Sequence, residues 1–272
     1  METLNYKSIC LQAIDTIKQT GLFILNERKS FTPSNVEIKG SHDYVSYVDK
    51  TAEKQLVEGL KTILPEAGFI TEEQTVIQEN KYYNWIIDPL DGTTNFIHGL
   101  PLYSISVALC EDENIIMGIV YEINLDECFY AWKDGGAYLN GTQISVTNTK
   151  DLDNSLIATG FPYYDYSRLS QYMNLFEDLM QHTRGIRRLG SAAVDLAYVA
   201  CGRFEVFYEY GLRPWDVAAG VLIVQEAGGI VTDFNNGNNF LFGKELIASN
   251  KGVFEEFSKK LQHYMNNSTL PS

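Results

Sequence analysis

Two aspartates and two threonines follow an apolar run closely in WIIDPLDGTTNFIHG, the segment spanning residues 85–99. Asp88 ends a strand-like run, and Pro89 cannot donate to a sheet ladder, so we expect the chain to leave the sheet there. Asp91 follows within one turn, and Gly92 permits a close backbone approach or a positive φ. Neighbouring carboxylates repel each other unless a cation neutralises them, and Mg²⁺ is the usual cation where phosphate also binds.

The threonines extend this chemistry. Thr93 and Thr94 predict the start of a short helix, whose exposed N–H groups would suit an anion and which Asp91 could cap. Two metal ions about 3.5–4 Å apart could bridge a phosphate at this position. One ion would then activate a water molecule, and the other would stabilise the leaving oxygen. The D-x-x-D-G pattern also fits a helix cap on a surface turn, so the segment alone leaves both interpretations open.

The rest of the chain must hold this segment in place. Apolar residues at helical spacing predict helices over residues 4–28, 48–64, 169–181, 191–202 and 215–229. Apolar runs bounded by turn residues predict strands over residues 68–73 and 84–89, an antiparallel meander over 103–141, and strands over 203–211, 229–234 and 245–250. The polar segment 29–44, with Pro33 and Gly40, is interpreted as a loop.

Helices and strands mix throughout without an internal repeat, which is typical of a layered α/β (α+β) protein. The length of 272 residues is enough for a sizeable core. We expect two parts in one compact catalytic unit. An N-terminal α+β part would span residues 1–150 and carry most of the acidic constellation, and a C-terminal α/β part would span residues 151–272.

Composition narrows the classes of partner. The net charge is −14, and an acidic surface repels nucleic acid, so we expect no DNA or RNA partner. No signal peptide is recognisable, and no apolar run approaches the ~20 residues of a membrane helix. We therefore expect a cytoplasmic protein without a membrane partner. The four cysteines form no C-x-x-C pair and are predicted to be core residues rather than redox or zinc ligands.

Longer strings carry a family resemblance. WIIDPLDGTTNF, with FITEE upstream and WDVAAG downstream, resembles the inositol monophosphatase family of metal-dependent, lithium-sensitive sugar phosphatases. DYVSYVDKTAEKQL, GGAYLNG and GSAAVDLAYVACGRFEVFYEYGLRPWDVAAGVLIVQEAGG are similar to family segments in order and spacing, from about residue 36 to 250. The resemblance, closest to bacterial members, implies a layered αβαβα sandwich, commonly a homodimer.

The resemblance also implies a site for two to three Mg²⁺ ions. Its metal ligands would be Glu72, Asp88, the carbonyl of Leu90, Asp91 and Asp216. Its catalytic residues would be Glu72, Asp49 and Thr93, the last two by orienting the attacking water. The backbone of Gly92 and Thr93 would hold phosphate oxygens, and the substrate-binding residues would also include Ala192, Glu209 and Asp216. Asp216 could at the same time cap the helix that it begins.

Several positions depart from the family pattern or stay open. Lys39, in the predicted loop, matches a position where the family often carries a mobile lysine. Tyr163 or Tyr164 stands where animal enzymes place a serine facing the sugar, and either tyrosine could face the substrate or only pack. The doublet Arg187-Arg188 is interpreted as a subunit contact or salt bridge rather than a substrate clamp.

The function that the resemblance implies is Mg²⁺-dependent hydrolysis of a phosphate monoester, with myo-inositol 1-phosphate as the leading substrate. The reaction would be direct in-line attack by water, without a phosphoenzyme. Alternative substrates are fructose 1,6-bisphosphate, 3′-phosphoadenosine 5′-phosphate and histidinol phosphate, which relatives in the same superfamily use. A different class remains open as well: a regulatory binding protein that kept the fold without the chemistry.

Overall fold

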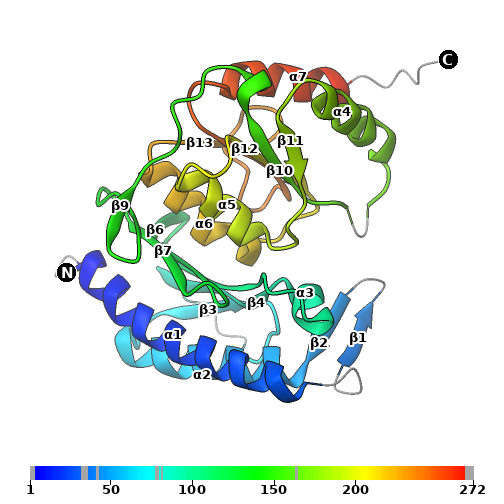
Figure 1. Ribbon diagram of the computed structural model, residues 1–272. Helices are drawn as coiled ribbons and strands as arrows, with labels where there is room; N and C mark the ends of the chain where they lie inside the picture. Colours follow the sequence, from blue (N-terminus) through cyan, green and yellow to red (C-terminus); the bar gives the residue numbers. More distant parts are fainter. Residues whose placement is uncertain are drawn as a thin grey trace.

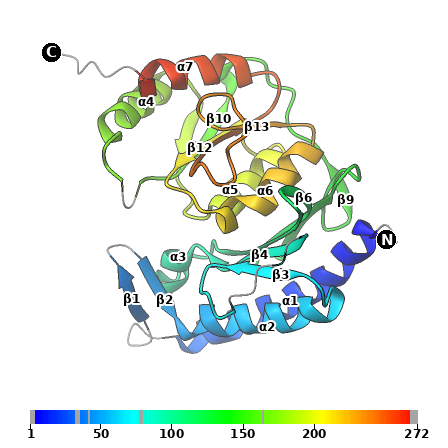
Figure 2. The same ribbon diagram turned by 180° about the vertical axis from the view of Figure 1, so that it is seen from behind.

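Five layers of helices and sheets stack in this computed structural model, which describes residues 4–31, 36–40, 43–76, 80, 82–162 and 165–266. Two helices cover a seven-stranded sheet, two more helices lie between that sheet and a five-stranded sheet, and a last pair covers the far side (Figures 1 and 2). This is the αβαβα order that the family resemblance implies.

The larger sheet carries the acidic segment. It has the spatial order β3-β4-β5-β6-β7-β8-β9, and only β3 and β4 pair in parallel. The antiparallel meander from β5 to β8 is the one predicted over residues 103–141, and β9 extends it beyond the predicted range. The strands are β3 (Gly68–Thr71), β4 (Tyr83–Asp91), β5 (Ser104–Glu111), β6 (Asn114–Glu122), β7 (Glu127–Trp132), β8 (Ala137–Leu139) and β9 (Thr142–Ile144).

The smaller sheet has the order β11-β10-β12-β14-β13 and mixes parallel and antiparallel pairs. Its strands are β10 (Leu156–Thr159), β11 (Gly185–Arg187), β12 (Val206–Tyr210), β13 (Ile230–Thr232) and β14 (Glu245–Ser249). The division expected at residue 150 falls between β9 and β10. Whether the two parts are separate domains stays a prediction.

Helices fill the other layers and bury their apolar faces against the sheets. Three clusters of buried side chains result, one under each outer helix pair and one around the central pair. The outer pairs are α1 (Tyr6–Ser30) with α2 (Tyr47–Ile63), and α4 (Leu169–Gln181) with α7 (Phe254–Asn266); the central pair is α5 (Ala192–Ala200) with α6 (Pro214–Glu226). The central pair is apolar nearly all round, as expected of helices covered on both sides.

Several local predictions were wrong or incomplete, and strands β9, β10 and β11 were not predicted. The segment predicted as a loop contains a two-stranded hairpin, β1 (Val36–Gly40) with β2 (Asp43–Ser46). Pro89 does not end β4, which continues to Asp91 through a register irregularity after Asp88. Such a bulge accommodates a proline and re-aims neighbouring side chains. Helix α7 was not predicted, although Phe257, Leu261 and Met265 on it are buried at helical spacing.

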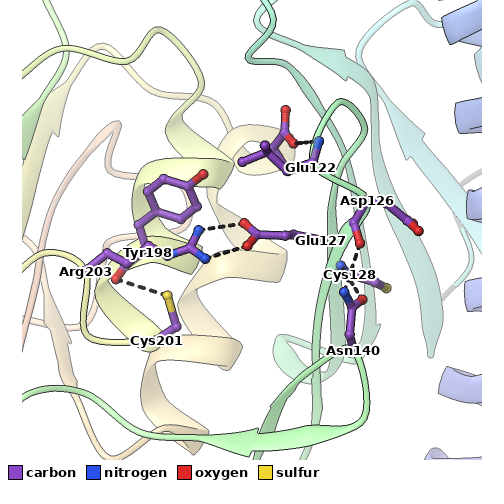
Figure 3. Close-up of polar contacts among 9 residues, drawn as sticks. Glu122, Asp126, Glu127, Cys128, Asn140, Tyr198, Cys201 and Arg203 are labelled. Carbon is purple, nitrogen blue, oxygen red and sulfur yellow. Dashed lines mark hydrogen bonds and ion pairs between the residues drawn. The ribbon is translucent and has the colours of Figure 1, made fainter.

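An ion pair joins the larger sheet to the central helices. Arg203, just after α5, donates two hydrogen bonds of 2.5 and 2.6 Å to Glu127 at the start of β7 (Figure 3). The guanidinium also lies over the Tyr198 ring, 4.4 Å from its centroid. A bidentate pair with an aromatic face has defined geometry, so it fixes the orientation of α5 relative to the sheet.

The burial of the four cysteines tests the prediction that they are core residues. Cys10, Cys110 and Cys128 are buried and Cys201 is partly buried, and all four are free thiols. Their role as core residues is thereby confirmed for the three buried ones.

Among the helices of the described residues, none combines the length and the apolar run that a bilayer crossing requires.

Candidate active site

A cavity of about 680 Å³ opens where the bulged end of β4 faces the first turns of α5 and α6. The side of the cavity formed by β4 continues into α3 (Thr93–His98), which Gly92 precedes at φ 96°. Every predicted site residue except Asp49 lines this one cavity: Glu72, Asp88, Leu90, Asp91, Gly92, Thr93, Ala192, Glu209 and Asp216.

Asp49 lies directly behind the cavity wall. Its carboxylate is fully buried and accepts hydrogen bonds from the Ser46 backbone N–H at 2.9 Å and the Ser46 hydroxyl at 2.5 Å, which forms a capping box at the start of α2. Its other oxygen lies 3.2 Å from the Thr93 hydroxyl, which lines the cavity. Thr93 Oγ1 also lies 2.9 Å from the Leu90 carbonyl. Burial raises the pKa of Asp49, and its hydrogen bonds oppose that rise.

Asp88 and Glu72 come from neighbouring strands. Asp88 is 2% exposed, and one of its oxygens accepts the Leu90 N–H at 2.9 Å. Glu72 follows β3, and its own N–H donates to the Ile87 carbonyl on β4 at 3.2 Å. Burial raises the pKa of Asp88 well above its usual range, and the charge of Glu72 raises it further. Two carboxyls so placed resist simultaneous ionisation until a cation joins them.

Asp91 does not cap the helix that follows it. That helix has no side-chain cap, and Asp91 points instead across the cavity to the start of α5. Its Oδ2 accepts hydrogen bonds from the Ser191 hydroxyl at 2.6 Å and the Ala193 N–H at 2.8 Å. Burial raises the pKa of Asp91 to about 6, against the lowering effect of these hydrogen bonds. A carboxylate from the larger sheet therefore satisfies the N-terminus of a central helix.

Asp216 caps its own helix, as its position suggested. One oxygen accepts the Arg213 backbone N–H at 2.8 Å at the start of α6. Burial, followed by the charge of Asp91, raises the pKa of Asp216 to about 7. One carboxylate oxygen is thus held by backbone, and the side chain lines the cavity beside the other acidic groups.

Glu209 forms the far wall on β12. Its carboxyl carbon is packed against Gly160, where a Cβ atom would lie only 1.9 Å from it. Burial raises the pKa of Glu209 to about 8, while the nearby Arg188 guanidinium lowers it. Ala192, 9% exposed, begins α5 on the same side of the cavity. Tyr163 and Tyr164 lie outside the described residues, and so does the side chain of Lys39.

The cavity contains residues that the sequence analysis missed. Arg188 lines it, and its charge stabilises the ionised forms of Asp91 and Glu209, while the interpretation of the Arg187-Arg188 doublet as a subunit contact or salt bridge stays a prediction. Asp195 on α5 also lines it and is 1% exposed. Ser191 fixes Asp91. The sequence offered one usable signal, a serine as the first residue of a predicted helix, where N-cap residues are common.

The donor set suits a hard divalent cation. Leu90 and the four proposed acidic ligands line one cavity, namely Glu72, Asp88, Asp91 and Asp216. Burial raises the pKa of each of these four carboxyls, and a bound cation would reverse that rise. Among the described residues, no three acidic, histidine or cysteine side chains already stand as a closed ligand set. The residues therefore fit a metal by their chemistry, and binding would require the carboxylates to turn toward it.

Comparison with known proteins shows to which family this chain belongs. The profile described as the inositol monophosphatase family matches residues 6–266. The chain belongs to the inositol monophosphatase family. Family membership supports a phosphatase activity and metal dependence in general terms.

Relatives of the family carry two kinds of name. An inositol-1-monophosphatase of Mesorhizobium japonicum is 40% identical over 80% of this chain and 82% of its own length. The Nus factor SuhB of Pseudomonas aeruginosa is 39% identical over 93% and 95%. A crystal structure of the extragenic suppressor protein SuhB from Bartonella henselae superposes with a TM-score of 0.88, at 37% identity over 94% and 98%. An IMPase structure from Thermotoga maritima follows at 0.84, with 35% identity over 93% and 96%.

Proposed function

We propose that this protein hydrolyses myo-inositol 1-phosphate to myo-inositol and phosphate, with Mg²⁺ as the cofactor. The observation that carries the proposal is that Glu72, Asp88, Asp91 and Asp216 line one cavity together with Glu209. The cluster of acidic groups suits metal-bridged phosphate, and the Glu209 carboxylate suits sugar hydroxyls. The cavity volume of about 680 Å³ lies within the usual range for small-molecule sites.

The metal ligands in this proposal are the side chains of Glu72, Asp88, Asp91 and Asp216, with the carbonyl of Leu90. Bound Mg²⁺, as two or three ions, supplies charge neutralisation for the phosphate and activation of water. Lithium should inhibit by competing for one of these positions. The backbone of Gly92 and Thr93 faces the phosphate, because Gly92 adopts φ 96° and lets the chain approach closely.

The chain's own residues position the attacking water. The Thr93 hydroxyl can accept a hydrogen bond from water while it donates to Asp49, 3.2 Å away. Asp49 is held in place by Ser46, so the direction of the Thr93 hydroxyl is fixed from behind. The water oxygen then attacks phosphorus in line with the ester oxygen, the phosphorus–ester bond breaks, and the ester oxygen leaves as the alcohol after gaining a proton that the attacking water gives up. Such phosphoryl transfer depends mainly on positioning and charge neutralisation.

Substrate recognition falls to Glu209 and the start of α5 in this proposal. The Glu209 carboxylate accepts hydrogen bonds from ring hydroxyls, and the Ala192 backbone faces the ring. Asp216 contacts the substrate from beside the metals. A bisphosphate substrate would need basic residues for its second phosphate, and the described cavity offers Arg188 and Arg213.

The experiment that tests the proposal is phosphate release from four esters with and without Mg²⁺. The esters are inositol 1-phosphate, fructose 1,6-bisphosphate, 3′-phosphoadenosine 5′-phosphate and histidinol phosphate. A strong Mg²⁺-dependent preference for the first would support both chemistry and substrate. Preference for another ester would retain the metal site and reassign the Glu209 wall. Release from none of them would reject the enzymatic proposal.

A second candidate function has its own observation, since several relatives at 39–43% identity are named Nus factors. In this alternative the chain acts through a partner and not through catalysis. We would express the wild type and Asp88→Asn in an Escherichia coli strain lacking its SuhB. Restoration by both would favour the partner role, and restoration by the wild type alone would favour chemistry. A homodimer, the expected assembly, is tested separately by sedimentation.

A further inference from the structure

Glu53 is a fully buried acidic residue that the proposed chemistry does not use. It lies on α2, one helical turn after Asp49, and a spacing of four residues places both side chains on the same face of the helix. A buried carboxylate is costly unless its oxygens are satisfied. What satisfies Glu53 therefore indicates what it does.

Its partners all belong to one short segment, residues 71–75, which begins at the last residue of β3. Oε1 accepts hydrogen bonds from the Thr71 hydroxyl at 2.9 Å, and from the N–H and hydroxyl of Thr75 at 2.7 Å each. Oε2 accepts the Glu73 N–H at 2.7 Å. The four donors flank Glu72 on both sides, and its own N–H is held by β4. All four donors are neutral, so the carboxylate acts as an acceptor for a turn.

We propose that Glu53 is a positioning residue that holds the turn of residues 71–75 so that the Glu72 carboxylate points into the cavity. This inference rests on the proposed role of Glu72 as a metal ligand. Helix α2 thus holds two parts of the site in position: Asp49 contacts the Thr93 hydroxyl, and Glu53 contacts the turn that carries Glu72. Groups that orient metal ligands from behind typically change metal affinity or activity by 10–100-fold when altered.

The geometry makes Glu53→Gln an informative variant. Gln has the size of Glu, but one of its two terminal atoms is an NH₂ group that can only donate. Either orientation of the amide places that NH₂ against at least one donor of the turn. The variant should therefore release part of the turn while leaving the packing of α2 in place.

The test compares Mg²⁺ binding by calorimetry and the Mg²⁺ dependence of phosphate release in the full-length protein. Glu53→Gln should weaken Mg²⁺ binding by about 10-fold or more. Thr75→Val, which removes one hydroxyl donor, should show a smaller loss in the same direction, and Thr75→Ser should restore wild-type binding. Both readouts are referred to the folded fraction measured by circular dichroism.

The matched control is Glu205→Gln. Glu205 is a buried glutamate that accepts a threonine hydroxyl at 3.0 Å and the Leu156 N–H at 2.7 Å, away from the cavity lining. The Glu205→Gln variant should have a lower melting temperature than the wild type and the same Mg²⁺ affinity. Equal Mg²⁺ affinity in Glu53→Gln and the wild type would overturn the positioning role and leave the proposed function intact. Failure of the wild type to bind Mg²⁺ would overturn both.

Discussion

Asp88 is the residue where burial and charge conflict most directly. It is 2% exposed, has one backbone hydrogen bond at 2.9 Å, and faces Glu72 and Asp91. A side chain in this position destabilises the metal-free fold, because its ionised form is desolvated and repelled by like charges. Strain of this kind is expected where function, and not stability, selects the residue.

Asp88→Asn should therefore separate activity from stability. The amide oxygen can still accept the Leu90 N–H, but the negative charge is gone. We expect Mg²⁺-dependent phosphate release to fall by more than about 100-fold, since a direct ligand should matter at least as much as a group behind it. At neutral pH the metal-free variant should melt a few degrees higher than the metal-free wild type. A variant that kept activity would remove Asp88 from the metal site.

Glu209 makes a prediction about pH. Its pKa, raised to about 8, means that the carboxylate gains charge as pH rises through that value. An ionised acceptor binds ring hydroxyls better than a neutral acid, so the KM for inositol 1-phosphate should fall as pH increases from about 7 to about 9. Glu209→Gln should raise KM and flatten this dependence, with kcat changed less. A pH profile of KM at saturating Mg²⁺ checks the expectation; an unchanged slope in the variant would contradict it.

At the scale of helices and strands, the close approach of one backbone segment to a side chain also shapes the site. At Gly160, just after β10, a Cβ atom would lie 1.9 Å from the Glu209 carboxyl carbon and about as close to both of its oxygens. That contact is impossible, so any side chain at this position would displace the Glu209 carboxyl group, which ends a flexible side chain. The glycine shapes the substrate wall without touching substrate.

Gly160→Ala should displace Glu209 and act mainly on KM. The double variant Gly160→Ala/Glu209→Ala should be no worse than Glu209→Ala alone, because both changes affect the same interaction. Steady-state kinetics on the four proteins measures that coupling. Additive losses would show that Gly160 serves some purpose other than placing Glu209.

The local spacing of apolar residues predicted most of the helices and strands. The features that it did not predict depend on contacts between residues far apart in the sequence. Helix α4 was predicted over its observed range, 169–181, because apolar side chains recur along its buried face. The partner of Asp91 could not be predicted, since Ser191 and Ala193 lie about a hundred residues away. The β1–β2 hairpin was missed because its sequence is polar and contains turn residues. Nothing in the sequence marks Glu53, because its burial depends on contacts between α2 and residues 71–75.

At the scale of the whole molecule, the acidic cavity links stability to pH and metal. The pKa values of Asp91 and Asp216 are raised to about 6 and about 7 from ordinary values near 3.8. The folded protein therefore binds more protons than the unfolded chain between about pH 4 and pH 7. Without metal, the stability these groups contribute is fully present below about pH 4 and is lost as pH rises through about 7.

Mg²⁺ should reverse this trend, since it binds the ionised groups. The increase in melting temperature caused by Mg²⁺ should be small near pH 5 and grow toward pH 8. Thermal unfolding in paired samples with Mg²⁺ or a chelator measures the difference. Calorimetry in buffers of different ionisation enthalpy should detect proton release on binding near pH 6. A metal effect independent of pH would contradict the linkage.

The hydrogen bond from Ala193 to Asp91 makes the ionic state of the cavity visible to spectroscopy. The amide proton of Ala193 lies along a 2.8 Å contact with one oxygen of that carboxylate, so its chemical shift should follow the charge there. Ala193 is fully buried, which keeps bulk solvent from obscuring the signal. A single backbone resonance at the start of α5 could thus report, in one titration, protonation and cation occupancy on the opposite wall.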